Sequence, residues 1–342
     1  MRAALNELLV LIVAVLLSLG VGAILIALRG HDPFMVYGVW FGEALGSAGG
    51  RSQVIFKTTT LIFTALASAL AFRGGMFNIG AEGQIYLGAF CAAALVFVLP
   101  ASTPGFVAVT AAFFAALSGG AVAALIPAVL KVRRHTHEVI TTMMMNFILL
   151  SVVNYFLRFA RESAEVVRTP PIPAAWRVLR FERGYDGNTV VLLAIVLALF
   201  ITWFLRRTRA GYAIRAIGSS PGAAELGGIA TGRVTLGVLV ASGAVAGLGG
   251  LNFVLGSPGY FEQHFAPFQG YLGIAVALLA RNHPFGIVPA AFLFAVLAEG
   301  GQAIQEWAPP ELGTILQAIT VVFVVLGAEL FARWEKRRLA HA

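Results

Sequence analysis

The sequence predicts an all-α polytopic membrane protein with about ten transmembrane helices and both termini in the cytoplasm. Composition, the length of the apolar runs and the distribution of basic residues predict this class. Of the 342 residues, 59% are hydrophobic and 12% are charged, whereas soluble domains average roughly 45–50% and about 25%. The apolar runs leave no length for a soluble domain, so we expect a single transmembrane domain over residues 1–342.

The apolar runs fall into two groups by length. A helix needs about 20 apolar residues to cross the roughly 30 Å hydrocarbon layer. Seven runs meet this length and lie near 5–28, 53–73, 105–130, 138–158, 189–205, 234–254 and 312–332. The first is longer than the roughly 7–15-residue core of a cleavable signal, so we expect it to remain as a helix. Three shorter runs, rich in Gly, Ala and Pro, lie near 82–99, 266–280 and 284–300. They either cross at a tilt or form broken or re-entrant helices that are buried in protein.

The basic residues set the orientation. The formal net charge of +8 comes from short clusters between apolar runs, which is typical of topology signals and does not indicate nucleic-acid binding. If the amino terminus is inside and every run crosses, the cytoplasmic side receives most of these clusters. Residues 159–188 then form a long extracytoplasmic loop, and residues 206–233 form the longest cytoplasmic loop.

No motif for bond-making chemistry is present. The sequence contains no phosphate-binding loop, G-x-S-x-G, H-E-x-x-H or C-x-x-C. Cys91 is the only cysteine, which excludes a disulfide within the chain. His135 and His137 lie in a turn with Lys131 and Arg133, whose positive charge opposes cation binding. We therefore expect no catalytic residue, metal site or cofactor in this chain.

Six polar residues within the apolar runs are candidates for a solute pathway, because polar groups in a membrane are costly and often functional. They are Asn78, Glu82, Gln84, Asn146, Thr60 and Thr64. Glu82, which the predicted topology places near the cytoplasmic face, is expected instead to complement a helix amino terminus, worth roughly 0.3–1 kcal/mol. Glu138 has the same position at the next inward-facing helix start.

The other candidates also have two interpretations. Asn146 lies about 12 Å above Glu138 along a helix, where it offers hydrogen bonds either to a hydroxylated solute or to a neighbouring helix. The neighbouring Met143, Met144 and Met145 are flexible enough to adapt to a passing ring. Thr60, Thr64 and Ser68 recur at four-residue spacing on one face, which favours helix packing over a pore wall.

The cytoplasmic stretch 211–229 predicts a short surface helix. Ser219 or Ser220 is placed to cap it, Pro221 suits its first turn, and Gly227 ends it. The small residues on one side are Gly222, Ala223 and Ala224. Small side chains permit another surface to dock closely, although an ordinary helical connector would show the same pattern.

Four stretches of the sequence resemble one family. The segment 211–229 looks like the loop by which permeases of ATP-binding-cassette (ABC) importers insert a coupling helix into a groove of the ATPase subunit. Three further stretches are similar to permeases for branched-chain amino acids, ribose and nucleosides: FRGGMFNIGAEGQIYLGAF at 72–90, HEVITTMMMNFI at 137–148 and GIAVALLARNHPFGI at 273–287. The combination of FNIGAEGQ with HEVITT looks most like the simple-sugar and nucleoside branch.

The resemblance implies a complete set of expectations. The fold would be the ten-helix permease fold of type II importers, in a bacterial cytoplasmic (inner) membrane. The residues that contact the ATPase would be Gly218, Ser220, Pro221, Ala224, Glu225 and Gly227. Partners would be separate or fused ABC ATPase subunits that bind ATP and Mg, a second permease in a heterodimer or a homodimer, and an extracytoplasmic solute-binding lipoprotein. The solute would be a nucleoside or a simple sugar.

Other functions stay open at this point. A permease of the same family for branched-chain amino acids would share these motifs. A self-sufficient secondary transporter would need an ion-coupling site, yet the predicted mid-membrane levels contain no clearly placed acidic residue. A membrane-embedded hydrolase or transferase would need a paired acid and nucleophile, which the apolar runs lack.

Overall fold

The structure is a computed structural model that describes residues 2–100, 102–162, 167–265, 267–309 and 311–340. These residues form helices joined by turns, and their β pairing is limited to two isolated bridges. The chain divides into two compact units. One contains Met1–Val54 and Phe292–Ala342, and the other contains Ile55–Ala291.

The described residues include helices that are long and apolar enough to cross a membrane, and further apolar helices that are shorter. The five long ones are α3 (Ala48–Arg73), α5 (Gly105–Arg134), α6 (Glu138–Leu157), α7 (Val190–Arg207) and the stretch Thr231–Gly256, which contains α10 (Thr231–Leu248) and η4 (Asn252–Gly256). Shorter apolar stretches lie in α1 (Arg2–Leu28), α4 (Ala81–Ala93) with η2 (Ala94–Phe97), α11 (Gln269–Leu279), α12 (Ile287–Ala303) and α13 (Glu311–Ala340). The predicted all-helical membrane class is confirmed.

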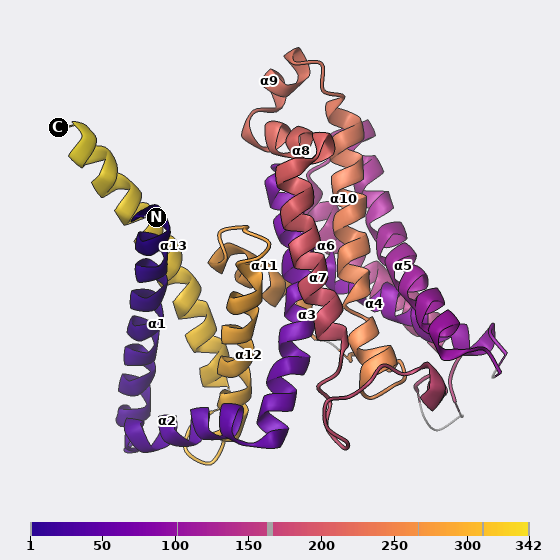
Figure 1. Cartoon of the computed structure of the whole chain (residues 1–342), viewed down its shortest axis with the longest axis horizontal. Coiled ribbons are helices and arrows are strands. Elements are labelled where there is room, and N and C mark those ends of the chain that lie inside the picture. Colours follow the sequence, from indigo (N-terminus) through magenta and orange to yellow (C-terminus); the bar gives the residue numbers. More distant parts are fainter. Residues whose placement is uncertain (1, 101, 163–166, 266, 310, 341–342) are drawn as a thin grey trace. The chain divides into compact units, whose positions relative to one another are not determined.

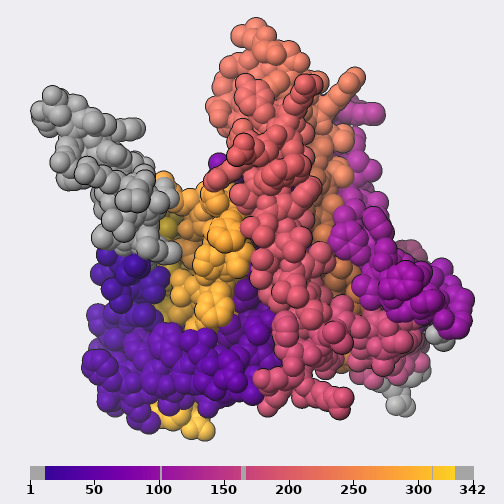
Figure 2. All heavy atoms as spheres, in the orientation of Figure 1, coloured from indigo at the N-terminus to yellow at the C-terminus, as the bar shows by residue number. Residues whose placement is uncertain are grey.

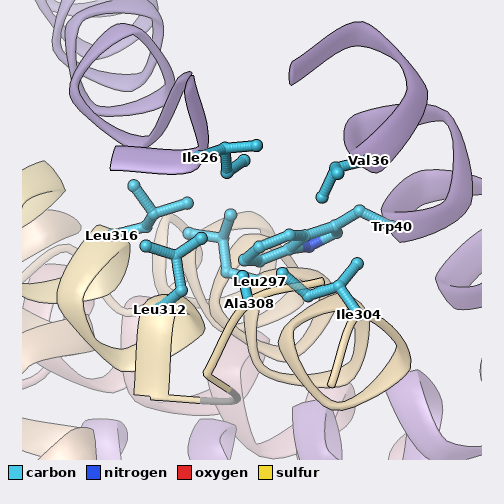
Figure 3. Close-up of a cluster of buried hydrophobic side chains, with 8 residues drawn as sticks. All are labelled: Ile26, Val36, Trp40, Leu297, Ile304, Ala308, Leu312 and Leu316. Atoms are coloured by element: carbon cyan, nitrogen blue, oxygen red, sulfur yellow. The ribbon is translucent and has the colours of Figure 1, made fainter. Parts of the chain in front are cut away.

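The first unit is held together by an apolar cluster around Trp40. This side chain lies on α2 (Pro33–Phe41), a helix that the sequence prediction did not include. Asp32 starts α2 by accepting a hydrogen bond from Phe34 N at 2.9 Å, and a proline follows it at the first helical position. Figure 3 shows the cluster: Ile26, Val36, Trp40, Leu297, Ile304, Ala308, Leu312 and Leu316. Trp40 is fully buried and packs directly on Gly300 of α12.

The second unit is built around the contact between α5 and α10, with α4 packed against both (Figure 1). The two longer helices approach each other at backbone distance. A Cβ atom added at Gly247 would lie 2.9 Å from the Cα of Gly120 and would also collide with the carbonyl oxygen of Ala116. Small residues at a helix interface are the usual means of close packing in a membrane. The glycine content of these helices is therefore explained by packing.

Two helices of the second unit begin inside the helical bundle. Non-helical residues 74–80 precede α4, and non-helical residues 257–265 lead toward α11. The eleven residues of α11 extend about 16 Å, roughly half of the hydrocarbon layer. For the run 266–280, this short helix favours a broken or re-entrant helix over a tilted full span.

The predicted cytoplasmic and outer loops of the second unit gather at opposite ends of it (Figure 1). At one end, Arg73 Nε donates to Asn282 O at 3.0 Å, and α8 (Arg209–Ser219) and α9 (Pro221–Leu226) lie there as well. At the other end, Trp176 Nε1 donates to Thr103 O at 3.0 Å. Val178 N donates to Leu255 O at 3.0 Å, which joins this part of the predicted outer loop to the η4 segment.

Candidate functional site

Two buried amides stabilise the start of α4. Asn78 Nδ2 donates to Gln84 Oε1 at 2.8 Å, and Gln84 Nε2 donates back to Asn78 Oδ1 at 3.0 Å. Asn78 Nδ2 also donates to Ser242 Oγ of α10 at 2.7 Å, and Ser242 in turn donates to Ala67 O of α3 at 2.7 Å. These three side chains are at most 2% exposed. In this conformation they connect α3, α4 and α10 and present no surface to a solute.

Glu82 lies in the first turn of α4, as predicted, and its carboxylate also binds the amino terminus of α11. Its Oε1 accepts a hydrogen bond from Phe268 N at 2.7 Å, and its Oε2 accepts one from Gly270 N at 2.7 Å. The non-helical residues 74–80 lie between Arg73 and α4. The expected position of Glu82 near the cytoplasmic face stays a prediction.

Asn146 fixes the same meeting point from α6. Its Oδ1 accepts from Gly83 N at 2.9 Å, and its Nδ2 donates to Ile79 O at 2.9 Å and to Tyr271 Oη at 3.1 Å. The side chain is 1% exposed. One amide thus holds the starts of α4 and α11 together, which supports the interhelical alternative for Asn146. Its contact to Tyr271 brings a residue that the sequence prediction overlooked into the site.

The threonine face of α3 is used for packing. Thr60 and Thr64 are fully buried. Thr60 Oγ1 accepts from Asn252 Nδ2 at 2.9 Å, and Asn252 Oδ1 accepts from Asn188 Nδ2 at 2.9 Å. Thr64 lies so close to Gly273 of α11 that no larger residue fits there. The structure supports the packing interpretation of this face over a pore wall.

Glu138, at the start of α6, forms an ion pair with Lys131 at the end of α5. Lys131 Nζ lies 2.7 Å from Glu138 Oε2, and the carboxylate side chain is 8% exposed. Removal of Lys131 would leave the buried Glu138 carboxylate without its charge partner, whereas the Lys131 side chain is 31% exposed. The ion pair therefore has a structural role at the end of α5.

The segment predicted as a surface helix contains two short helices, α8 and α9. Thr208 Oγ1 accepts from Gly211 N at 3.0 Å, and Ser220 Oγ accepts from Ala223 N at 3.4 Å. The segment stands out from one end of the second unit (Figure 2). Pro221 follows the cap of α9, as predicted.

The outward face of α9 differs from the prediction. Ala224 is 5% exposed and packs against the chain itself, whereas Leu226 is 93% exposed. Ala224 therefore does not share an exposed small-residue side with Gly222 and Ala223. Leu226 was overlooked, although a large apolar residue between Glu225 and Gly227 in a cytoplasmic loop is a detectable signal.

Gly218 brings α8 against the start of the non-helical segment 74–80. A Cβ atom at Gly218 would collide with the carbonyl oxygen of Arg73 and lie 3.1 Å from Gly75 N. Gly75 itself has a φ of +73°, a conformation that favours glycine. The two backbones therefore touch without a side chain between them.

These features define the class of the protein. It is a multi-pass helical membrane protein in which the start of the short helix α11 binds Glu82 of α4, and whose surface segment extends beyond the bundle. The family model described as branched-chain amino acid transport system / permease component matches residues 50–325. The chain belongs to this family, as its sequence motifs predicted.

Relatives in this family share most of the chain. The glucose ABC transporter permease protein of Haloferax volcanii is 32% identical over 94% of this chain and 88% of its own length. The guanosine ABC transporter permease protein of Bacillus subtilis is 32% identical over 94% and 93%. The nucleoside ABC transporter permease protein of Lactococcus lactis is 29% identical over 94% and 91%. This chain is accordingly an ABC permease component, a transport subunit.

Proposed function

We propose that this permease moves a nucleoside or a simple sugar inward across a bacterial cytoplasmic membrane by alternating access. Its similarity to glucose, guanosine and nucleoside permeases supports this solute class. The structural observation that supports the proposal most is the exposed α8–α9 segment. The backbone of Gly218 in α8 contacts the backbone of Arg73 and Gly75, which lead to α4. Movement of partner subunits would reach the membrane helices through this contact.

The proposal includes the complete topology. Five long and five shorter apolar stretches support ten membrane helices, with both termini cytoplasmic, in the fold of type II importer permeases. This orientation places α8 and α9 in the cytoplasm and the loop 159–188 outside. The positive-inside rule supports it, since the α8–α9 end carries the arginine-rich turns.

The energy source would lie outside this chain. We assign ATP and Mg to separate or fused ABC ATPase subunits, and expect no cofactor in the permease. A second permease, in a heterodimer or alternatively a homodimer, and an extracytoplasmic solute-binding lipoprotein complete the assembly. The α9 segment, with Gly218, Ser220, Pro221, Glu225 and Gly227 around it, is the proposed contact for the ATPase, and Leu226 is its exposed apolar centre.

Transport by the assembled complex tests the proposed function. The complex with its ATPase, second permease and lipoprotein is placed in lipid vesicles, and uptake of radiolabelled guanosine, glucose and leucine is measured with and without ATP. We expect ATP-dependent uptake of guanosine or glucose. Uptake of leucine alone would favour the branched-chain amino acid alternative. Uptake by the isolated permease under an ion gradient would indicate a secondary transporter and overturn the proposal.

The pathway through the membrane is proposed near Glu82. Among the six pathway candidates, Asn78, Gln84, Asn146, Thr60 and Thr64 are buried and have hydrogen-bond partners within the chain. Glu82 alone among them remains partly exposed. It is therefore the candidate that a solute could reach without rearrangement of the helices.

A further inference from the structure

We propose that Glu82, Phe268 and Tyr271 form a solute-contact site that accepts neutral hydroxylated rings and rejects anionic groups. The proposal rests on the proposed function and names the chemistry of its solute. All three residues belong to the second unit. They lie where α4 meets the amino terminus of α11.

The aromatic part of the site is available to a ring. The Phe268 side chain is 70% exposed, and Tyr271 is partly exposed. Their ring centroids lie 6.3 Å apart with an interplanar angle of 46°. Exposed aromatic faces stack on bases and rings of any identity. This pair therefore offers one open aromatic surface beside Glu82.

The polar part of the site has unused hydrogen-bonding capacity. Each Glu82 oxygen accepts one backbone hydrogen bond, and an ionised carboxylate has about four acceptor positions. Tyr271 Oη accepts from Asn146, which leaves its own hydrogen free to donate. Gln269, which lies between Phe268 and Tyr271 in the sequence, has a buried Oε1 without a hydrogen-bond partner among the described residues. Solute hydroxyl groups would donate to Glu82, and a solute oxygen would accept from Tyr271.

The arrangement also determines what the site rejects. The amino terminus of a half-length helix in a transporter commonly binds an anionic solute group through its free N–H groups. At α11 those N–H groups at residues 268 and 270 already donate to Glu82. A solute carboxylate or phosphate would find these two donors occupied and would face the acceptor oxygens of Glu82. The geometry thus favours nucleosides over nucleotides and over zwitterionic amino acids.

Fluorescence can detect this contact without the lipoprotein, whose own selectivity would dominate an uptake assay. In the purified permease–ATPase complex, Phe268→Trp places an indole at the aromatic surface. We expect guanosine to quench its emission with saturation and guanosine 5′-monophosphate to cause no quenching. The matched control is Tyr155→Trp on the exposed face of α6, which should show no saturable quenching.

Two further substitutions separate contact from structure. In the Phe268→Trp background, Glu82→Gln should weaken guanosine binding by about tenfold, the size expected for hydrogen bonds to a charged group. Binding of 2′,3′-dideoxyguanosine, which lacks the donating hydroxyls, should change less than twofold. Tyr271→Phe, which leaves the Glu82 hydrogen bonds in place, should also weaken guanosine binding. Glu182→Gln in the outer loop is the matched control and should have no effect.

The outcomes distinguish the site from the function. Equal weakening of both nucleosides by Glu82→Gln, or no loss with Tyr271→Phe, would overturn the solute-contact site. If the wild-type assembly transports a nucleoside or sugar with ATP and Phe268→Trp shows no quenching, only the site is wrong. If the wild-type assembly transports neither, the proposed function itself fails.

Discussion

At the residue scale, burial decides between the two interpretations that the sequence leaves open. An amide such as Asn146 or Gln84 has the same appearance in a sequence whether it meets a solute or a helix. In the structure both are buried with their amide groups bonded inside the chain. Glu82 differs because its partners are backbone groups and its side chain is partly exposed.

The amide pair leads to a stability prediction. Gln84→Leu removes both hydrogen bonds to Asn78 and leaves the buried Asn78 amide with fewer partners. We expect a loss of about 1–3 kcal/mol in unfolding free energy, measured as a lower thermal midpoint of the purified protein in detergent. Gln305→Leu changes an exposed glutamine in the same way and should leave the midpoint unchanged. Equal midpoints for the two variants would contradict the role assigned to the pair.

At the scale of elements, the sequence predicts the existence of the helices better than their mutual contacts. The short Gly-rich runs form helices shorter than most of the long spans, and α4 continues into the 3-10 turn η2, whereas α12 is a regular helix of 17 residues. The bond from Glu82 to the amino terminus of α11 joins residues 188 positions apart, and neither segment specifies the other. The side of α9 occupied by Ala224 was likewise unpredictable, since it depends on the helices packed behind it.

The contact between α5 and α10 gives a matched pair of glycine substitutions. Gly247→Ala would place a methyl group against the backbone of Gly120 and Ala116, whereas Gly237→Ala on the same helix meets nothing within 4 Å. We expect Gly247→Ala to lower the thermal midpoint and Gly237→Ala to leave it unchanged or raise it, because alanine favours a helix by about 1 kcal/mol. A tolerated Gly247→Ala would show that the two helices can separate freely.

The exposed apolar centre of α9 gives a prediction for coupling. Leu226→Asp should abolish most ATP-dependent uptake and weaken copurification of the ATPase, because a charge would replace the exposed apolar side chain. The protein should remain folded, since Leu226 contacts little of its own chain. The control is Leu179→Asp, an exposed leucine of the outer loop. Unchanged uptake and ATPase copurification in the α9 variant would exclude this contact.

At the scale of the whole molecule, the described helices and the distribution of basic residues support one orientation, and accessibility from each side can test it. Cys91 is the single cysteine, so Cys91→Ala provides a background without thiols. In that background Leu226→Cys should react with a membrane-impermeant thiol reagent only from the cytoplasmic side. Glu182→Cys should react only from outside. Labelling of both positions from one side would contradict the proposed topology.

The backbone contact between Gly218 and Gly75 makes the connection between α8 and residues 74–80 stiff as well as close. Flexible side chains at a contact can absorb a small displacement by changing rotamer, but here backbone meets backbone. A displacement of α8 would therefore move residues 74–80 by nearly the same amount. Those residues lead to Glu82 in the first turn of α4. The route from the proposed ATPase contact to Glu82 is thus short and almost entirely main chain.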